Sequence, residues 1–287
     1  MAHYDVNGKV ALITGGGRGI GLGIAGALAA RGASIALVDI EPDGVQEAAA
    51  RLPGNAIGLT ADVTNVAQIN AAVAAAVERF GGVDIVVANA GIAPVPASAR
   101  VMDPVEFERV VEVDLLGVYR TIHAGMDQLV ARRGHAVLVS SVYAFLNGML
   151  LSPYAVSKAG VEQLGRALRV ELAVHGAGAT VAYFGFVDTR MVQEGLEHRR
   201  AIAGEDEEML PAFLRKMITP EHAGEVVARA IERRRARVIA PRWWAAWSTL
   251  RGIVNPALDF AAARVPKIQD VLREGDTAPP PQPKSRS

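Results

Sequence analysis

Cysteine is absent from this chain of 287 residues, which excludes disulfides and thiolate chemistry. The 30 basic and 30 acidic side chains cancel to a formal net charge of zero, so no overall field attracts nucleic acid. No uninterrupted apolar run is long enough to span a bilayer, and residues 1–5 lack a signal-peptide pattern. We therefore expect a cytoplasmic protein with no nucleic-acid partner, and we predict no metal site.

Apolar side chains make up 51% of the residues, which is enough for a substantial core. Up to residue 240, short apolar runs alternate with longer amphipathic stretches, as is typical of a parallel sheet with helices on both faces. The predicted strands are residues 9–14, 34–39, 56–60, 83–88, 136–139, 179–184 and 237–240. The predicted helices are residues 20–31, 67–80, 104–132, 153–175 and 220–234. We predict one Rossmann-like, doubly wound α/β domain over residues 1–240, with about seven strands.

A glycine-rich turn follows the first predicted strand and precedes the first predicted helix. It reads Gly15-Gly16-Gly17-Arg18-Gly19-Ile20-Gly21. Glycines let the backbone approach a pyrophosphate, and the helix N-terminus offers free N–H groups and the positive end of its dipole. A flexible turn without a ligand is the alternative. The strand before the turn and the helix after it favour a dinucleotide site.

Asp39 ends the second predicted strand, about where a dinucleotide fold binds the adenosine ribose. A carboxylate there bonds the ribose hydroxyls and repels the 2′-phosphate of NADP, so Asp39 favours NAD. Arg18 favours NADP instead, because a cation in the glycine turn can bind a 2′-phosphate. The acid lies where the ribose must lie, and we therefore predict NAD over NADP. A helix cap or turn residue is the alternative interpretation of Asp39.

Polar or flexible residues follow most of the predicted strands. In open α/β sheets, ligands bind beyond the carboxyl ends of the strands, so these residues are expected to gather around one site. They are Gly15, Asp39, Asp62, Asn89, Ser141 and Gly185.

Tyr154 and Lys158 lie four residues apart in the predicted helix 153–175, which places both side chains on one face. A tyrosine hydroxyl ionises near ~10, and a nearby ammonium lowers that pKa, so the pair can exchange a proton with an alcohol oxygen. The spacing is common by chance, and an amphipathic helix with a surface lysine is the alternative. The nucleotide turn and the polar strand ends favour catalysis.

Residues 190–218 mix apolar and charged side chains. This pattern predicts mobile helices that form a lid over a hydrophobic cleft, and a pair of amphipathic surface helices is the alternative. The apolar members are Met191, Met209, Leu210, Phe213, Leu214 and Met217.

All three tryptophans lie just after Pro241, and aliphatic residues and arginines follow them. We predict a helical C-terminal extension over residues 241–275. Residues 242–260 suit a cover over a subunit interface or a lipophilic pocket, and they also suit peripheral contact with a membrane surface. Residues 276–287 are rich in Pro, Ser and Lys and are predicted to be disordered.

From about residue 6 to residue 240, the chain resembles the short-chain dehydrogenase/reductase family. Residues 14–21 match the family's TGxxxGxG loop. Asn89-Ala90-Gly91 matches its NAG motif, which steadies the central sheet and lines the adenosine side. Asp62-Val63 matches its adenine-contacting pair. The order and the strand-end positions of these motifs make the resemblance specific.

The resemblance also implies catalytic roles. Ser141 precedes Tyr154 at the family's usual spacing, and Tyr154 with Lys158 matches the YxxxK motif. Tyr154 would be the acid or base on the substrate oxygen, Ser141 would orient that oxygen, and Lys158 would hold the nicotinamide ribose and lower the Tyr154 pKa. The implied cofactor contacts are Gly15, Gly17, Arg18, Gly19, Ile20, Gly21, Asp39, Asp62, Val63, Asn89, Ala90, Gly91, Tyr154, Lys158, Gly185, Val187 and Thr189.

Two positions depart from the family pattern. The family's usual asparagine, which holds a water linking the lysine to solvent, is Asp114 here. An aspartate adds negative charge near a developing phenolate, so we expect slower turnover or a shifted pH optimum. The family's Pro-Gly after the sixth strand is Phe184-Gly185 here, and we expect Phe184 to fill the core rather than stack near the nicotinamide.

The resemblance implies an NAD-dependent alcohol dehydrogenase or ketone reductase. The apolar lid and the tryptophan-rich extension favour a lipophilic secondary alcohol or ketone, such as a steroid, terpenoid or lipid. The alternative function is a regulatory or scaffold protein that binds NAD(H) with little turnover, which only Asp114 supports. Family members form dimers or tetramers through two long helices, here residues 104–132 and 153–175, so a homodimer or homotetramer is expected.

Overall fold

The structure is a computed structural model that describes residues 3–195 and 216–277. Its seven strands are β1 (Val10–Thr14), β2 (Ser34–Asp39), β3 (Ala56–Thr60), β4 (Ile85–Ala88), β5 (His135–Ser141), β6 (Gly178–Phe184) and β7 (Arg237–Ala240). They form one parallel sheet in the order β3-β2-β1-β4-β5-β6-β7. The strand order reverses between β1 and β4, which opens a crevice at the carboxyl ends of these strands. The predicted doubly wound fold is confirmed.

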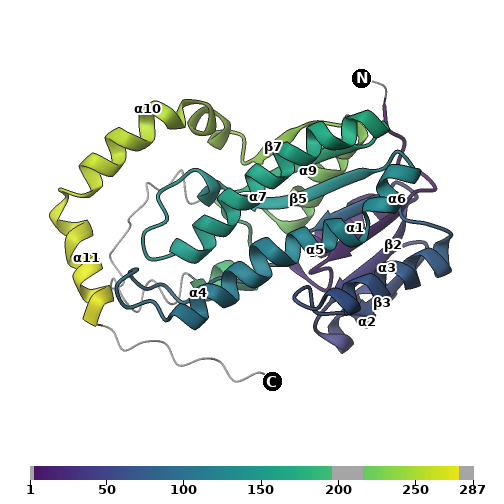
Figure 1. Ribbon diagram of the computed structural model, residues 1–287, viewed down its shortest axis with the longest axis horizontal. Helices are drawn as coiled ribbons and strands as arrows, with labels where there is room; N and C mark the ends of the chain where they lie inside the picture. Colours follow the sequence, from purple (N-terminus) through teal and green to yellow (C-terminus); the bar gives the residue numbers. More distant parts are fainter. Residues whose placement is uncertain (1–2, 196–215, 278–287) are drawn as a thin grey trace.

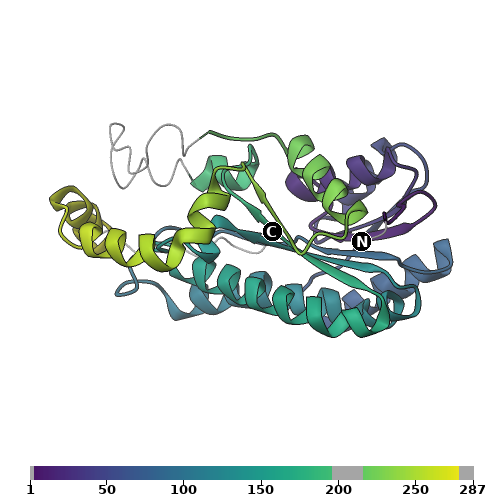
Figure 2. The ribbon, with the colours of Figure 1, turned by 90° about the horizontal axis from the view of Figure 1, so that it is seen from above.

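Helices cover both faces of the sheet (Figures 1 and 2). The described α-helices are α1 (Gly19–Ala29), α2 (Pro42–Arg51), α3 (Val66–Phe80), α4 (Pro104–Val111), α5 (Gly117–Ala124), α6 (Met126–Ala131), α7 (Ser152–Glu171), α9 (Pro220–Glu232), α10 (Trp244–Ala262) and α11 (Pro266–Thr277). Residues of α1, α2 and α9 pack in one core on one face, and residues of α3, α5 and α7 pack in a second core on the other. The central strands β1, β4, β5 and β6 are buried at every position, which explains their near-continuous apolar sequences.

The helix predicted over residues 104–132 is interrupted. After α4 the chain makes a π-helical turn, η1 (Glu112–Leu116), and Gly125 separates α5 from α6. A π-helical turn inserts one residue into the helical ladder and occurs often at functional sites. In this turn the side chain of Asp114 is completely buried. Helix α2 was not predicted from the sequence, and its first turn contains Pro42 and Gly44.

The C-terminal extension forms an arch of two helices beyond one end of the sheet (Figure 1, yellow). At its start, the Trp244 side chain is 1% exposed and packs in a small core with Val142 and Phe145. At its end, Asp276 accepts a hydrogen bond from the Ser98 hydroxyl and pairs with Arg100 at 3.2 Å. The arch is therefore attached to the domain at both ends. Helix α11 reaches Thr277, so the first two residues of the predicted disordered tail, 276 and 277, are helical, and the rest of it lies outside the described residues from position 278 onward.

Most of the predicted lid also lies outside the described residues, which omit 196–215. Among the residues that the structure does describe, no helix is long and apolar enough to cross a membrane. The cytoplasmic location and the peripheral membrane contact stay predictions.

Acid is expected to destabilise the fold through His135, which is fully buried at the start of β5. Its Nε2 lies 2.8 Å from the Thr180 hydroxyl, which itself donates to the Arg235 carbonyl, so Nε2 carries the proton. Burial, with Arg234 and Arg169 nearby, lowers the pKa of His135 to about 3. Between about pH 6.5 and 3 the unfolded chain therefore binds a proton that the folded chain does not, and stability falls as pH falls.

The His135→Gln variant is expected to remove this dependence while keeping a polar partner for Thr180. From about pH 7 to pH 5, the unfolding free energy of the wild type should fall by about 2 kcal/mol more than that of the variant. Urea unfolding of both proteins at the two pH values measures the difference. An equal fall in both proteins would show that His135 is not the acid-sensitive group.

Candidate functional site

Helix α7 brings Tyr154 and Lys158 together in its first two turns. The Lys158 ammonium nitrogen lies 5.3 Å from the centre of the Tyr154 ring, and the Lys158 side chain is almost completely buried. Tyr154 as a whole residue is half-buried, and its hydroxyl end lies in the interior. The spacing predicted a shared helix face, and the structure places the two side chains on one.

Ser141 is the last residue of β5 and reaches the same place from the sheet. Its hydroxyl is close enough to Tyr154 to lower the pKa of the Tyr154 hydroxyl. The Ser141 oxygen also accepts the backbone N–H of Tyr143 at 3.2 Å and lies 3.3 Å from the Phe184 carbonyl. These backbone partners hold the hydroxyl in position beside Tyr154. Phe184 is buried in the core, as predicted.

Asp114 forms a buried ion pair with Lys158. One carboxylate oxygen of Asp114 lies 3.2 Å from Lys158 Nζ, and the other accepts the Ile92 backbone N–H at 2.7 Å. Lys158 Nζ also lies 3.4 Å from the Val139 carbonyl. The π-helical turn positions Asp114 to contact both Lys158 and the Ile92 N–H. The aspartate at the asparagine position therefore contacts the lysine directly.

The charges of this cluster oppose one another. Burial raises the pKa of Tyr154, the Lys158 ammonium lowers it, and the Asp114 carboxylate raises it, with a net rise. Burial lowers the pKa of Lys158, but Asp114 and Tyr154 outweigh burial and raise it above its ordinary value. The sequence predicted a net fall in the Tyr154 pKa, and for the protein chain by itself that is wrong. Burial is the larger effect, and it was not visible in the spacing of the two residues.

The glycine turn is built for close backbone approach. A Cβ atom on Gly21 would lie 2.2 Å from the Gly15 carbonyl oxygen, so any larger residue would push the turn open. Helix α1 starts there with no side-chain cap and no acidic residue in its first turn, which leaves its N–H groups available to an anion. Ile20 lies half-buried within this first turn, and Arg18 is exposed beside it. These features fit the pyrophosphate of a dinucleotide.

Asp39 lies at the carboxyl end of β2, next to the glycine turn. One of its carboxylate oxygens accepts the Gly17 backbone N–H at 2.9 Å, and the other accepts that of Glu41 at 3.3 Å. These bonds fix the carboxylate at the place where the adenosine ribose is expected. The turn-residue interpretation is thus also correct in part, because Asp39 bonds the backbone of its own turn.

The other expected cofactor contacts lie near the carboxyl ends of the strands. Asn89 donates from its amide to the carbonyls of Thr14 and Gly15, at 3.1 and 3.0 Å, and so ties β4 to the glycine turn. Ala90 lies against Gly15, and a Cβ atom on Gly91 would lie 3.2 Å from Asp114. The loop after β3 contributes Asp62, whose side chain accepts the Thr64 N–H at 2.8 Å, and the buried Val63.

The segment after β6 lies on the other side of the glycine turn. A Cβ atom on Gly19 would lie 3.2 Å from the Thr189 methyl group, and Val187 is buried and bridges to Ile218. Gly185 faces the Trp244 indole of the C-terminal extension, because a Cβ atom there would lie 2.6 Å from Trp244 Nε1. The structure thus brings the expected residues to one end of the sheet.

Sequence reasoning missed two contributors to the site, Tyr143 and Ile92, and placed Trp244 only in a general cover over a pocket or an interface. The Tyr143 ring packs edge-on against Tyr154, with ring centres 5.9 Å apart. The Ile92 N–H holds Asp114, and Trp244 packs beside Gly185. Tyr143 follows Ser141 by two residues, so its closeness to the site could have been suspected. The Ile92 contact with Asp114 joins distant parts of the chain and has no signal in the sequence, whereas the tryptophan cluster indicated a cover without naming Gly185 as its partner.

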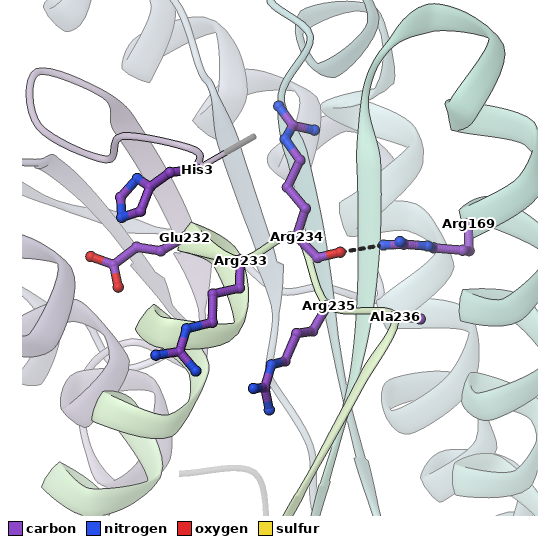
Figure 3. A pocket seen from close by; sticks show the side chains of 7 residues that line it. All are labelled: His3, Arg169, Glu232, Arg233, Arg234, Arg235 and Ala236. Carbon is purple, nitrogen blue, oxygen red and sulfur yellow. Dashed lines mark hydrogen bonds between the residues drawn. The ribbon is translucent and has the colours of Figure 1, made fainter. Parts of the chain in front are cut away.

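A cavity of about 520 Å³ lies at the other end of the sheet and is not part of this site (Figure 3). Its lining residues are His3, Arg169, Glu232, Arg233, Arg234, Arg235 and Ala236. Two of its cations are engaged with the protein backbone, since Arg169 donates to the Arg234 carbonyl and Arg234 donates to the Arg133 carbonyl. The cavity lies beside the start of β7, whereas Ser141 ends β5 and the other residues predicted for catalysis come from α7 and η1.

Comparisons with known proteins agree with this geometry. The short chain dehydrogenase family model matches residues 9–200, which is more than half of the chain. The 3-oxoacyl-[acyl-carrier-protein] reductase FabG of Escherichia coli is 34% identical over 198 residues, covering 69% of this chain and 81% of that protein. Galactitol 2-dehydrogenase of Agrobacterium fabrum is 37% identical over 185 residues, covering 64% of this chain and 72% of that protein.

A solved structure shows the same likeness. The crystal structure of 3-ketoacyl-(acyl-carrier-protein) reductase from Brucella melitensis, complexed with NADH, superposes with a TM-score of 0.71 at 29% identity. The match covers 83% of this chain and 99% of that one.

Proposed function

Because the chain belongs to the short-chain dehydrogenase/reductase family, we propose that it transfers a hydride between NAD(H) and a secondary alcohol or ketone. One observation carries this proposal. Ser141, Tyr154 and Lys158 meet at the carboxyl ends of the strands, beside a glycine turn whose shape fits a dinucleotide. Family membership supports an oxidoreductase that uses NAD or NADP, and the preference for NAD is part of the proposal.

Tyr154, Ser141 and Lys158 have different tasks in the proposed reaction. When bound, the nicotinamide supplies or accepts the hydride. Tyr154 takes the proton of the alcohol as it is oxidised, or gives a proton to the carbonyl oxygen as it is reduced. Ser141 donates a hydrogen bond to that oxygen and orients it, and the Lys158 ammonium stabilises the Tyr154 phenolate. Lys158 is also expected to hold the nicotinamide ribose.

The preference for NAD rests on Asp39. Its fixed carboxylate is an acceptor for ribose hydroxyls and repels a 2′-phosphate. The Asp39→Asn variant keeps an oxygen acceptor for the Gly17 N–H but removes the charge. We expect the ratio of kcat/KM with NAD to kcat/KM with NADP to fall at least tenfold, about 1.4 kcal/mol, because repulsion of the 2′-phosphate is lost.

Steady-state kinetics with both cofactors measures this ratio. The matched control is Asp39→Asn with Arg18→Ala, because Arg18 is exposed beside the turn and is the cation available to a 2′-phosphate. The double variant should use NADP less well than Asp39→Asn alone. An unchanged ratio in Asp39→Asn would remove the argument for NAD.

A lipophilic substrate is the finer part of the proposal. The tryptophan-rich extension supports it, because Trp244 and Trp247 join Val142, Tyr143 and Phe145 in a small apolar cluster beside Ser141. The relatives are named for different substrates, a 3-oxoacyl chain on a carrier protein and a sugar alcohol. The test must therefore include both kinds of molecule.

The direct test is a panel of secondary alcohols and ketones, assayed by the absorbance of NADH. The panel should contain steroids, terpenoids, a 3-oxoacyl thioester and polyols of similar size. The proposal predicts turnover, with higher kcat/KM for the lipophilic members than for the polyols. Turnover of polyols alone would overturn the lipophilic assignment and leave the reaction class in place.

A second function is favoured by one specific observation, the buried Asp114 carboxylate 3.2 Å from Lys158 Nζ, whose negative charge contributes to a raised Tyr154 pKa. A regulatory or scaffold protein would bind NAD(H) and turn over little. Tight NADH binding without turnover of any panel member would favour this function. The enzymatic function is favoured over the regulatory one by the presence of all three catalytic side chains, Ser141, Tyr154 and Lys158.

We also propose a homodimer or homotetramer that uses α4 to α6 and α7. Apolar side chains are exposed on these helices and on the short helix η3 (Leu172–His175) that follows them, which suits a packed interface. They are Val105, Leu116, Tyr119, Val156, Val170 and Val174. Sedimentation of the wild type gives the oligomeric state.

A further inference from the structure

Helix α10 points its polar face toward the protein. Arg251 forms two hydrogen bonds with the Glu162 carboxylate, at 2.7 and 2.8 Å. Four residues later, Asn255 donates to the Phe145 carbonyl at 2.6 Å, and four residues after that, Asp259 accepts from Asn147 at 2.9 Å. This spacing places all three contacts on one side of the helix, because residues four apart lie one above the other.

The opposite side of α10 is apolar and exposed. Trp243, Leu250, Ile253 and Phe260 are 38%, 51%, 77% and 62% exposed, and Ala246 and Ala257 are also exposed. At about 100° per residue, the centre of this row lies about 180° from the polar contacts. A helix on a water-soluble domain normally has the reverse arrangement, with its apolar face inward. We call this row of six residues the α10 stripe.

The spacing of the α10 stripe suits another helix. Its members follow one another at intervals of three, four, three, four and three residues, which is the a/d pattern of a two-helix seam. A strict a/d row is narrower than the broad apolar face of a helix that packs on a sheet or lies in a membrane.

The order of side-chain types along the α10 stripe is the same from either end. From either end its order is aromatic, alanine, aliphatic, aliphatic, alanine, aromatic. In an antiparallel pair about a two-fold axis, Trp243 faces Phe260, Ala246 faces Ala257, and Leu250 faces Ile253. A two-fold interface requires such self-complementarity.

Charge supports the antiparallel pairing over a lipid surface. Residues 242–277 carry five basic side chains, Arg242, Arg251, Arg264, Lys267 and Arg273, against four acidic ones, Asp259, Asp270, Glu274 and Asp276. A membrane-surface helix is typically rich in Lys and Arg on its polar face, and here that face is engaged with the domain. An antiparallel partner would instead place its Arg242 beside the carboxyl end of this α10, where the helix dipole is negative.

We propose that the α10 stripe binds a second copy of this chain, whose α10 packs antiparallel against it. The inference does not rest on the proposed enzymatic function. The alanine pairs allow the two helices to approach to about 8 Å, the close end of the usual interaxial range. One helix pair buries less than the ~1,200 Å² of a typical stable interface, so this contact is expected to act together with the interface proposed on α4 to α7.

Cysteine cross-linking tests the pairing sharply, because the chain has no cysteine of its own. Two variants are made, Ala246→Cys and Ala257→Cys, and oxidised under mild conditions alone and as a mixture. Each chain then carries one cysteine, so any disulfide joins two chains. In the antiparallel pair, like positions lie about 16 Å apart, and a disulfide needs Cα atoms within ~7 Å. The proposal predicts covalent dimers in the mixture and none above background in either variant alone.

Ala50→Cys supplies the control for random collision. Ala50 is exposed on α2, which lies on the other half of the domain. Its mixture with Ala246→Cys should give only background cross-linking. Adding Ile253→Glu to both Ala246→Cys and Ala257→Cys should abolish the covalent dimer in their mixture, because it buries an unpaired carboxylate between the two helices. The substitution should leave the fold of each chain intact, because Ile253 is 77% exposed.

Three results would overturn the proposal. Cross-linking of Ala246→Cys with itself would indicate a parallel pair. No cross-linking in the mixture would exclude a second copy on this face. Sedimentation of the wild type, but not of Ile253→Glu, with vesicles of phosphatidylcholine and phosphatidylserine, without cross-linking in the mixture, would identify a lipid surface as the partner.

Discussion

The Tyr154→Phe variant is expected to lose roughly a hundredfold to ten-thousandfold in kcat/KM, the range typical of a general acid or base. Phenylalanine keeps the aromatic ring that packs edge-on against Tyr143 and lies near Lys158. It removes only the hydroxyl, which lies near Ser141 and would exchange the proton with substrate. Folding and NADH binding should therefore stay close to those of the wild type.

Three measurements on one preparation separate these effects. Turnover gives kcat/KM, fluorescence titration gives the Kd for NADH, and urea unfolding gives stability. The matched control is Tyr119→Phe, which removes a hydroxyl from a half-exposed ring on α5 and should leave activity unchanged. Activity of Tyr154→Phe within a few fold of the wild type would show that another group moves the proton.

The Asp114→Asn variant is expected to oxidise alcohols faster at neutral pH, by several fold. Asp114 raises the pKa of Tyr154 above the value set by burial and Lys158, so removing its charge lowers that pKa. Oxidation needs the phenolate, and its rate therefore rises as pH rises through the Tyr154 pKa. In the variant, this rise should occur at lower pH than in the wild type.

Asparagine is the informative replacement because its amide oxygen can still accept the Ile92 N–H. Asp114→Ala is the contrasting variant, since it leaves both the N–H and the buried Lys158 ammonium without this partner. Removal of one member of a buried ion pair typically destabilises a protein by about 3–5 kcal/mol, so Asp114→Ala should unfold at much lower urea concentration.

Profiles of kcat/KM against pH, for wild type and Asp114→Asn, test the role of the carboxylate. Superposed profiles, a rise at higher pH in the variant, or lower activity at every pH would each contradict it. The same profiles separate the two functions proposed for the chain. If the variant gains activity that the wild type lacks, Asp114 is the group that holds turnover down.

The strands and the glycine turn were predictable because their signals are local. An apolar run that ends at Thr14, followed by glycines and a helical pattern, specifies its own geometry. The four-residue spacing of Tyr154 and Lys158 on a helix is equally local. The site residues gathered as expected because parallel strands place their carboxyl ends on one side.

The π-helical turn at Asp114 was not predictable, because its partners come from elsewhere in the chain. The Ile92 N–H and Lys158 stabilise a local geometry that the sequence of residues 112–116 does not itself favour. The orientation of α10 was hidden for the same reason. Its apolar row was visible in the sequence, but the contact of Arg251 with Glu162 decides which side faces the domain.

Transfer of deuterium tests the central claim most directly. A secondary alcohol that turns over in the panel is prepared with deuterium on its carbinol carbon and incubated with NAD and the protein. The account predicts reduced cofactor that carries one deuterium per molecule with the wild type, and almost no reduced cofactor in the same time with Tyr154→Phe. Reduced cofactor without deuterium, or labelled cofactor formed by Tyr154→Phe as fast as by the wild type, would contradict the assignment of hydride transfer to this site.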